Sequence, residues 1–136
     1  VVKGKRVVMI DDSIVRGTTS RRIVQLLKEA GAAEVHVAIG SPELKYPCFY
    51  GIDIQTRREL ISANHTAEEV CEIIGADSLT YLSIEGMIEA IGIDTDAPNG
   101  GLCVAYFDGN FPTPLYDYEE PYLKSLKEKT SFYLEK

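Results

Sequence analysis

An adjacent pair of acids followed by small hydroxyl residues is the part of this sequence best suited to chemistry. Asp11 and Asp12 end an apolar run that begins at Val7, and Ser13–Thr19 then combines Ser, Gly, Thr and one Arg. Carboxylates accept hydrogen bonds from vicinal hydroxyls or bind Mg²⁺, whereas hydroxyls and backbone N–H groups at a helix start bind phosphate. The stretch therefore predicts a site for a ligand with hydroxyls or a metal at one end and a phosphate at the other.

The loop residues have separate expected roles. Gly17 lets the backbone approach a ligand closely, and Arg16 supplies positive charge. Ser13, Thr18 and Thr19 supply hydroxyl donors. A ribose 5-phosphate fits this pattern, with its diol on the acids and its phosphate in the loop. A plain strand-to-helix turn with capping acids and threonines is the simpler interpretation of a lone acidic pair, but the complete order of residues favours a binding site.

A strand, a helix and a second strand are expected to position this site. Arg6–Ile10 predicts a strand buried on both faces, since short β-branched runs suit a covered parallel sheet. Thr19–Ala30 predicts a helix that Thr18 or Thr19 caps and Gly31 ends. Glu34–Ile39 predicts the next strand, which gives a right-handed βαβ unit. The expected buried face of the helix consists of Ile23, Leu26, Leu27 and Ala30.

The rest of the chain predicts loops and short elements. Thr66–Glu69 matches a capping box, so a helix is expected to run to Ile74 and to end at Gly75. The other expected elements are a loop at Gly40–Gly51, short strands at Gly51–Ile54 and Leu79–Leu82, a helix at Ile84–Ile91 ended by Gly92, a turn at Ala97–Gly101, a strand at Leu102–Phe107 and a charged helix within the tail from Phe111.

Composition excludes several classes of protein. The chain has 136 residues and a net charge of −7, which argues against broad electrostatic binding of nucleic acid or anionic lipid. No apolar run approaches the roughly 20 residues of a membrane span, and the first residues do not form a signal peptide. The three cysteines, Cys48, Cys71 and Cys103, are widely spaced, which is typical of reduced thiols. We therefore expect a cytoplasmic protein without a membrane or nucleic-acid partner.

The stretch VVMIDDSIVRGTTS resembles the phosphoribosyl diphosphate (PRPP) motif of type I phosphoribosyltransferases. The stretches PCFYGIDIQTRRELI, IGADSL and GGLCVAYF narrow the resemblance to the amidophosphoribosyltransferase family, the glutamine-dependent first enzymes of purine synthesis. The resemblance covers nearly the whole chain. It implies an α/β fold, with a type I phosphoribosyltransferase-like parallel sheet flanked by helices. Residues 1–110 would form the C-terminal portion of that domain and residues 111–136 a C-terminal tail with a helix.

The resemblance also implies roles for individual residues. Asp11 and Asp12 match the acids that contact ribose and Mg²⁺, and Ser13–Thr19 match the 5′-phosphate loop, where purine nucleotides also bind as feedback inhibitors. Full-length members are expected to be homo-oligomers. Their glutaminase domain, pyrophosphate loop and closing loop precede the PRPP motif. This chain is therefore expected to be an inactive C-terminal fragment without a side-chain nucleophile.

Some members of the family hold a 4Fe–4S iron–sulfur cluster on four cysteines. Cys48 and Cys103 stand at ligand-like positions, but Gly100 stands where another ligand would lie, and a fourth would lie upstream. This departure from the family's pattern argues against a cluster, and we interpret Cys48 and Cys103 as buried structural thiols. Cys71 is interpreted as a packing residue of a helix.

Residues outside the loop suggest no second site. His36 and His65 have no ligand-spaced partner and are interpreted as structural or surface residues. Arg57 and Arg58 are interpreted as a solvated helix face, with a nucleotide or interface role left open by the resemblance.

Two other classes of function remain as alternatives. A receiver-like phospho-acceptor domain would pair Asp11 and Asp12 with Asp53, but that class needs an acid-rich pocket and a Lys after its last strand, where this chain has Asp108. A nucleotide-binding regulatory module without catalysis would use the same Gly/Thr-rich loop. Labelling of Asp53 by acetyl phosphate would favour the first, and AMP or GMP binding without turnover the second.

Overall fold

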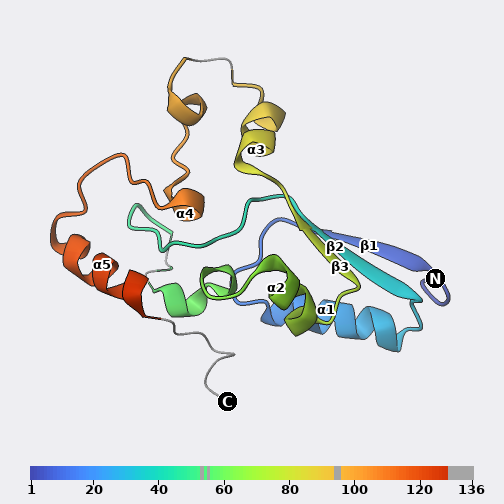
Figure 1. The fold of residues 1–136 in the computed structure, drawn as a ribbon. Coiled ribbons are helices and arrows are strands. Elements are labelled where there is room, and N and C mark those ends of the chain that lie inside the picture. Colours follow the sequence, from blue (N-terminus) through green and yellow to red (C-terminus); the bar gives the residue numbers. More distant parts are fainter. Residues whose placement is uncertain (53, 55, 94–95, 129–136) are drawn as a thin grey trace.

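The computed structural model describes residues 1–52, 54, 56–93 and 96–128. Its centre is a three-stranded parallel sheet in the order β1-β2-β3, formed by β1 (Arg6–Asp11), β2 (Glu34–Ile39) and β3 (Ser78–Tyr81) (Figure 1). The predicted α/β class and the βαβ order are confirmed. The expected strand at Gly51–Ile54 includes residue 53, which lies outside the described residues, and residues 51, 52 and 54 are not in a strand.

Two helices cover one face of this sheet. α1 (Thr18–Glu29) and α2 (Ala67–Ile74) lie side by side beneath the strands in Figure 1. The alternate residues of β2 point toward these helices and are almost completely buried. The shared core consists of Ile14, Val24, Val35, Val37, Ile39, Ile61, Val70 and Ile74. The loop after β1 therefore starts from a strand end and enters a helix that is packed on that core.

The prediction that the first strand is buried on both faces is wrong. Met9 packs against the core, but Val8 and Ile10 on the opposite face are 64% and 80% exposed. β1 pairs only with β2 among the described residues, and α1 and α2 lie on the face that Met9 occupies. An apolar run without alternation cannot indicate which of its faces a helix will cover.

The predicted buried face of α1 is largely wrong. Ser20 and Val24 are buried and Leu27 packs against the core, whereas Ile23 and Leu26 are 36% and 47% exposed. The true stripe includes a serine, so a count of apolar residues favoured the neighbouring stripe. The cap also differs from the prediction. Gly17 is the N-cap without a side-chain cap, which places Thr18 and Thr19 inside the first turn.

The predicted boundaries of α2 are confirmed. Thr66 and Glu69 form the capping box, with Glu69 N donating to Thr66 Oγ1 at 3.3 Å and Thr66 N donating to Glu69 Oε2 at 2.8 Å. Gly75 ends the helix with a φ of 75°. The helix α3 (Ile84–Ile91) and its terminal glycine are also confirmed.

The strand predicted at Leu102–Phe107 is wrong. Its second half forms the single helical turn α4 (Ala105–Asp108), which Gly109 closes in the left-handed conformation. Val104 and Ala105 are buried, and the Tyr106 carbonyl accepts hydrogen bonds from the backbone N–H groups of residues 45 and 46. These contacts dock the segment onto the loop after β2 instead of onto the sheet. The turn expected before it is the 3₁₀ turn η3 (Pro98–Gly101).

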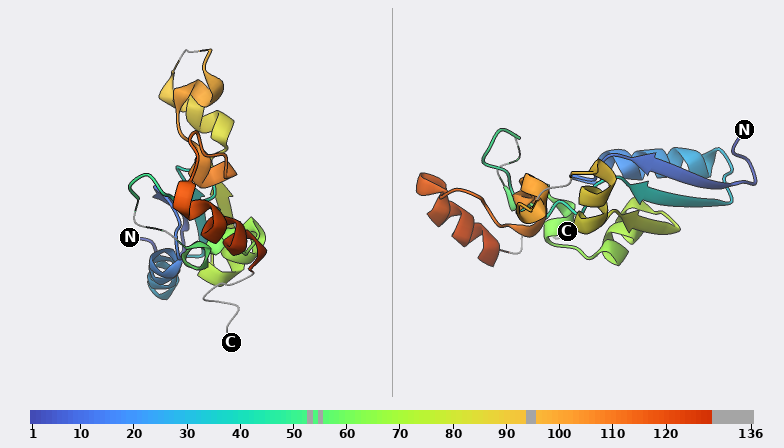
Figure 2. Two further views of the ribbon diagram at one scale, coloured as in Figure 1. Left: turned by 90° about the vertical axis from the view of Figure 1, so that its left-hand side faces the viewer. Right: turned by 90° about the horizontal axis from the view of Figure 1, so that it is seen from above.

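The C-terminal segment packs on the loop after β2. A 3₁₀ turn, η4 (Tyr116–Tyr118), leads into α5 (Glu119–Lys127), which matches the expected charged helix. Phe49 contacts the rings of Phe111, Tyr118 and Tyr122 at centroid distances of 5.4, 5.2 and 5.9 Å. Figure 2 shows α5 at the end of the molecule away from the strands. No helix among the described residues is long and apolar enough to span a bilayer.

Candidate functional site

The structure brings the predicted binding residues together. An open pocket of about 420 Å³ lies where β1 ends and α1 begins. Its lining includes every residue predicted to bind a ligand: Asp11, Asp12, Ser13, Arg16, Gly17, Thr18 and Thr19. Ligands of parallel α/β sheets bind at the carboxyl ends of strands, which is the position of this pocket.

The acids at the end of β1 are held by backbone hydrogen bonds. Asp11 Oδ1 accepts from Asp12 N at 3.0 Å, and Asp12 Oδ1 accepts from Ser13 N at 2.6 Å. The Asp11 carbonyl accepts from Gly40 N at 2.9 Å, which fixes it against the end of β2. Each of these side-chain bonds uses one carboxylate oxygen and orients the other, so the pair can receive hydroxyl donors of a ligand.

Gly17 allows the loop to lie against the core. Its φ of 75° is in the left-handed region, which favours glycine. A Cβ atom there would lie 3.0 Å from Ile61 Cδ1 and 3.5 Å from Ile74 Cγ2. Since no side chain caps α1 at this residue, a phosphate in the pocket would face backbone N–H groups and the positive end of the helix dipole.

Arg16 forms a contact that the sequence did not predict. Its Nη2 forms an ion pair with Glu59 Oε1, and Glu59 Oε2 accepts from Thr56 Oγ1 at 3.0 Å. The hydrogen bond from Arg16 is the main cause that lowers the pKa of the Glu59 carboxyl, while partial burial opposes it. Glu59 lies 43 positions from Arg16 in the chain, so no local motif connects them.

The acidic pair suits Mg²⁺ better than it suits a metal ion whose ligands all come from protein side chains. No group of three or more His, Cys, Asp or Glu side chains in the described part of the chain could hold a metal ion. Mg²⁺ commonly uses one or two carboxylates together with substrate phosphate oxygens and water. Asp11 and Asp12, beside a loop suited to phosphate, provide that kind of donor set.

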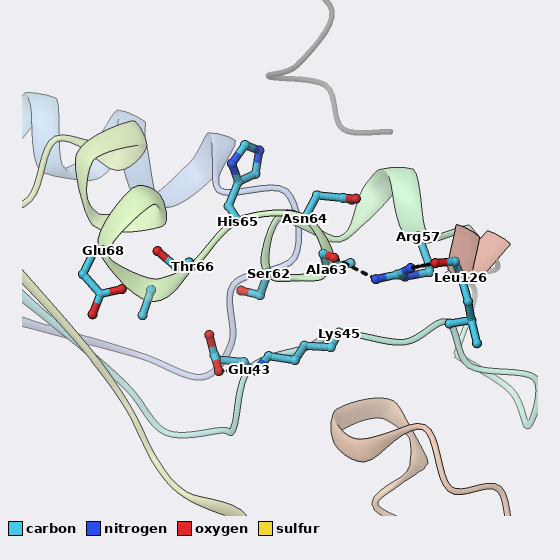
Figure 3. A pocket seen from close by; sticks show the side chains of 11 residues that line it. Glu43, Lys45, Arg57, Ser62, Ala63, Asn64, His65, Thr66, Glu68 and Leu126 are labelled. Carbon is cyan, nitrogen blue, oxygen red and sulfur yellow. Dashed lines mark hydrogen bonds and ion pairs between the residues drawn. The ribbon is translucent and has the colours of Figure 1, made fainter. Parts of the chain in front are cut away.

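A second pocket, of about 560 Å³, is less suited to an anion (Figure 3). Lys45 Nζ pairs with Glu43 Oε2 at 2.6 Å. The half-buried Arg57 donates to the carbonyls of Ala63 at 2.7 Å and Leu126 at 3.3 Å. These partners already engage both cations. They also show that the prediction of a solvated helix face is wrong for Arg57, because this residue connects the end of α5 to the 3₁₀ turn η2 (Ile61–Ala63).

The cysteines differ in their surroundings. Cys71 is half-buried and donates to the Ala76 carbonyl at 3.3 Å, and burial is the main cause that raises its pKa, as expected of a packing thiol. Cys48 is half-buried, and its Sγ accepts from Tyr50 N at 3.4 Å. Cys103 is exposed, so its prediction as a buried thiol is wrong.

The remaining predictions concern His36 and the aspartates Asp53 and Asp108 of the receiver-domain alternative. His36 makes hydrogen bonds of 2.8 Å with Ser78 and with Glu34 across the open face of the sheet, which fits a structural role. Asp53, the acceptor in the receiver alternative, lies outside the described residues. Asp108 ends α4 and does not follow a strand of the sheet.

Comparison with known proteins identifies close relatives. No model of a protein family matches the chain. The chain is 55% identical over all of its 136 residues to an amidophosphoribosyltransferase of Staphylococcus aureus, of which it spans 28%. It is 58% identical over 125 residues, or 91% of its length, to the amidophosphoribosyltransferase of Bacillus subtilis, of which it spans 26%.

Solved structures agree with these relatives. The fold matches glutamine PRPP amidotransferase from B. subtilis, complexed with ADP and GMP, with a TM-score of 0.81 and 59% identity, covering 85% of this chain and 26% of that one. It matches a structure described as the allosteric regulatory enzyme of purine biosynthesis with a TM-score of 0.82 and 56% identity, covering 91% of this chain and 27% of that one. In sequence and in fold, the chain corresponds to one segment of the amidophosphoribosyltransferases.

Proposed function

We propose that this chain carries the PRPP ribose-phosphate site of an amidophosphoribosyltransferase. The observation that supports this most directly is the single pocket that Asp11, Asp12 and the loop Ser13–Thr19 line together. In the proposed complex the ribose diol donates hydrogen bonds to the acids. The 5′-phosphate accepts hydrogen bonds from the loop and from the first turn of α1.

The proposed reaction is the first step of purine synthesis, a glycosyl transfer. Ammonia released from glutamine attacks C1 of PRPP, the bond from C1 to the pyrophosphate oxygen breaks, and the new C1–N bond gives 5-phosphoribosylamine after loss of a proton. Positive charge develops on the ribose ring in the transition state, so nearby carboxylates stabilise it. Ammonia is the nucleophile, and the site therefore needs no nucleophilic side chain.

Asp11 and Asp12 are the residues that would hold Mg²⁺. When bound, Mg²⁺ neutralises charge on the departing pyrophosphate. The protein side chains orient the sugar: the acids hold the diol, and Thr18 and Thr19 hold the phosphate at the opposite end. Fixing the sugar at both ends keeps C1 in place for attack.

The remaining proposed properties concern the whole enzyme. We propose a cytoplasmic homo-oligomer with an N-terminal glutaminase domain, which binds purine nucleotides as feedback inhibitors and has no nucleic-acid or membrane partner. Residues 1–110 would belong to its phosphoribosyltransferase domain and residues 111–136 to a tail. The B. subtilis relative, described as complexed with ADP and GMP, supports the nucleotide role. The 136-residue chain alone would be inactive.

Absence of an iron–sulfur cluster stays a prediction. Gly100 occupies one expected ligand position, and Cys103 and Cys48 alone cannot satisfy four iron coordination sites. Protein purified without oxygen is expected to contain no stoichiometric iron or acid-labile sulfide, measured by colorimetric assay. Stoichiometric iron with a broad visible absorbance band would contradict this prediction.

Calorimetric titration tests the proposed site in the 136-residue chain. Ribose 5-phosphate is expected to bind, and substitution of both Thr18 and Thr19 by alanine is expected to weaken binding by roughly tenfold, through loss of hydroxyl hydrogen bonds. Circular dichroism checks that each protein is folded. The chain alone is expected to release no pyrophosphate from PRPP and ammonia. If the folded chain binds no phosphate ligand, the proposed site is refuted. If AMP or GMP binds far more tightly than ribose 5-phosphate or PRPP–Mg²⁺ does, the regulatory alternative is favoured.

A further inference from the structure

We infer that Glu59 is an internal anion that occupies the Arg16 guanidinium until the phosphate of a ligand replaces it. The inference rests on the proposed phosphate site and adds a residue that lies outside the loop. Arg16 lines the pocket and at the same time forms an ion pair with Glu59. A phosphate that enters the pocket therefore competes with the Glu59 carboxylate for the same cation.

The pair lies where such an exchange can occur. The Arg16 side chain is 53% exposed and the Glu59 side chain 24% exposed, so the guanidinium can reach the pocket while the carboxylate stays partly covered. Guanidinium groups bind carboxylate and phosphate with the same forked geometry. A phosphate dianion carries more charge than a carboxylate, which favours the exchange once a ligand is bound through the rest of the loop.

Backbone contacts hold Glu59 beside the loop. Glu59 ends the 3₁₀ turn η1 (Arg57–Glu59), and just beyond it Ile61 N donates to the Val15 carbonyl at 2.8 Å. Gly17 lies against the Ile61 side chain, which brings the same segment beneath the loop. The position of Glu59 is therefore set by the fold and not only by the ion pair.

Arg57 anchors the other end of this turn. It donates to the carbonyls of Ser125 and Leu126 at the end of α5, both at 3.3 Å. It also donates to the Ala63 carbonyl, and Figure 3 shows the contacts with Ala63 and Leu126. The turn that presents Glu59 is thus fixed between η2 and α5. The affinity of the pocket for phosphate therefore depends on the Glu59 carboxylate, which does not line the pocket.

The substitution Glu59→Gln tests the exchange by calorimetric titration of the 136-residue chain with inorganic phosphate and with ribose 5-phosphate. Removal of the competing charge is expected to tighten binding of both by roughly tenfold. Glu59→Asp keeps the charge and is expected to stay near the unmodified affinity. Glu119→Gln makes the same change of net charge in the first turn of α5, and is expected to have no effect. A purely structural role for Glu59 would instead weaken binding when the residue is changed.

A double-mutant cycle assigns the effect to Arg16. In an Arg16→Ala background, Glu59→Gln is expected to change the affinity by less than about twofold. Equal tightening in both backgrounds, or unchanged or weaker binding in Glu59→Gln alone, would overturn the inference. Failure of every folded variant and of the unmodified chain to bind phosphate would instead refute the site itself.

The unmodified chain provides a readout that does not depend on a variant. The pKa of the Glu59 carboxyl, followed by ¹³C NMR, is expected to rise toward its ordinary value when phosphate saturates the pocket, because Arg16 then leaves the carboxylate. The same titration curve with and without bound phosphate would overturn the exchange.

Discussion

Replacement of both Asp11 and Asp12 by asparagine is expected to lower phosphoribosylamine formation by at least about a thousandfold, or about 4 kcal/mol in transition-state stabilisation. Asparagine can still bond to the ribose diol, but it has no negative charge to stabilise the developing cation or to hold Mg²⁺. The measurement is the steady-state rate with saturating PRPP and ammonium salt, in an amidophosphoribosyltransferase that contains this segment. Asp11 and Asp12 are the only acids among the described residues that line the pocket, so no other described carboxylate of its lining can replace them.

The matched control is Asp117→Asn, which removes an exposed carboxylate from η4. It is expected to leave the rate unchanged. A rate within tenfold of the unmodified enzyme after the double substitution, in a folded protein, would contradict the role of the acids. Use of ammonium salt instead of glutamine separates this loss from any effect on ammonia release.

The substitution Gly17→Val is expected to destabilise the folded chain by about 3 kcal/mol and to weaken ribose 5-phosphate binding by more than about tenfold. A β-branched residue is strained at a φ of 75°, by about 1–2 kcal/mol. Its Cβ would also meet Ile61 Cδ1 at 3.0 Å, and such overpacking costs about 1–3 kcal/mol. Movement that relieves the contact displaces the start of α1 from the pocket. Urea denaturation and calorimetric titration measure the two effects.

Gly75→Val provides the matched control for Gly17→Val. Gly75 also has a φ of 75°, but a Cβ there would have no atom within 4 Å. Valine at this position is expected to show the backbone strain alone, about 1–2 kcal/mol, and unchanged ligand affinity. Equal losses of stability and affinity at both glycines would contradict the proposed importance of the contact with Ile61.

The sequence predicted the site better than it predicted the packing around it. The loop Ser13–Thr19 is contiguous, and a strand end followed by a helix start has a definite geometry, so local chemistry was sufficient. The capping box at Thr66 and the glycine at residue 75 likewise fixed α2 from adjacent residues. The segment at Leu102–Phe107 was predicted wrongly because its conformation depends on docking against residues 45 and 46, which are distant in the chain.

Long-range polar contacts were also beyond the sequence. Arg57 was predicted to lie on a solvated helix face, yet it donates hydrogen bonds to carbonyls at the end of α5. Glu59 was given no role from the sequence, yet it pairs with Arg16. No sequence spacing predicts either pairing, because the partners are distant in the chain and come together only in the folded structure. The residues that adjust the site are therefore harder to predict than the residues that form it.

The open face of β1 links the site to whatever covers that strand. Val8 and Ile10 are largely exposed, and β1 has one strand neighbour among the described residues, yet its last residue is Asp11 of the pocket. A partner that packs on Val8 and Ile10 would contact the strand that carries Asp11, and any shift that it caused in the end of this strand would change the ligand affinity of the pocket. Thermodynamic linkage then requires the ligand to change the affinity of that partner by the same factor.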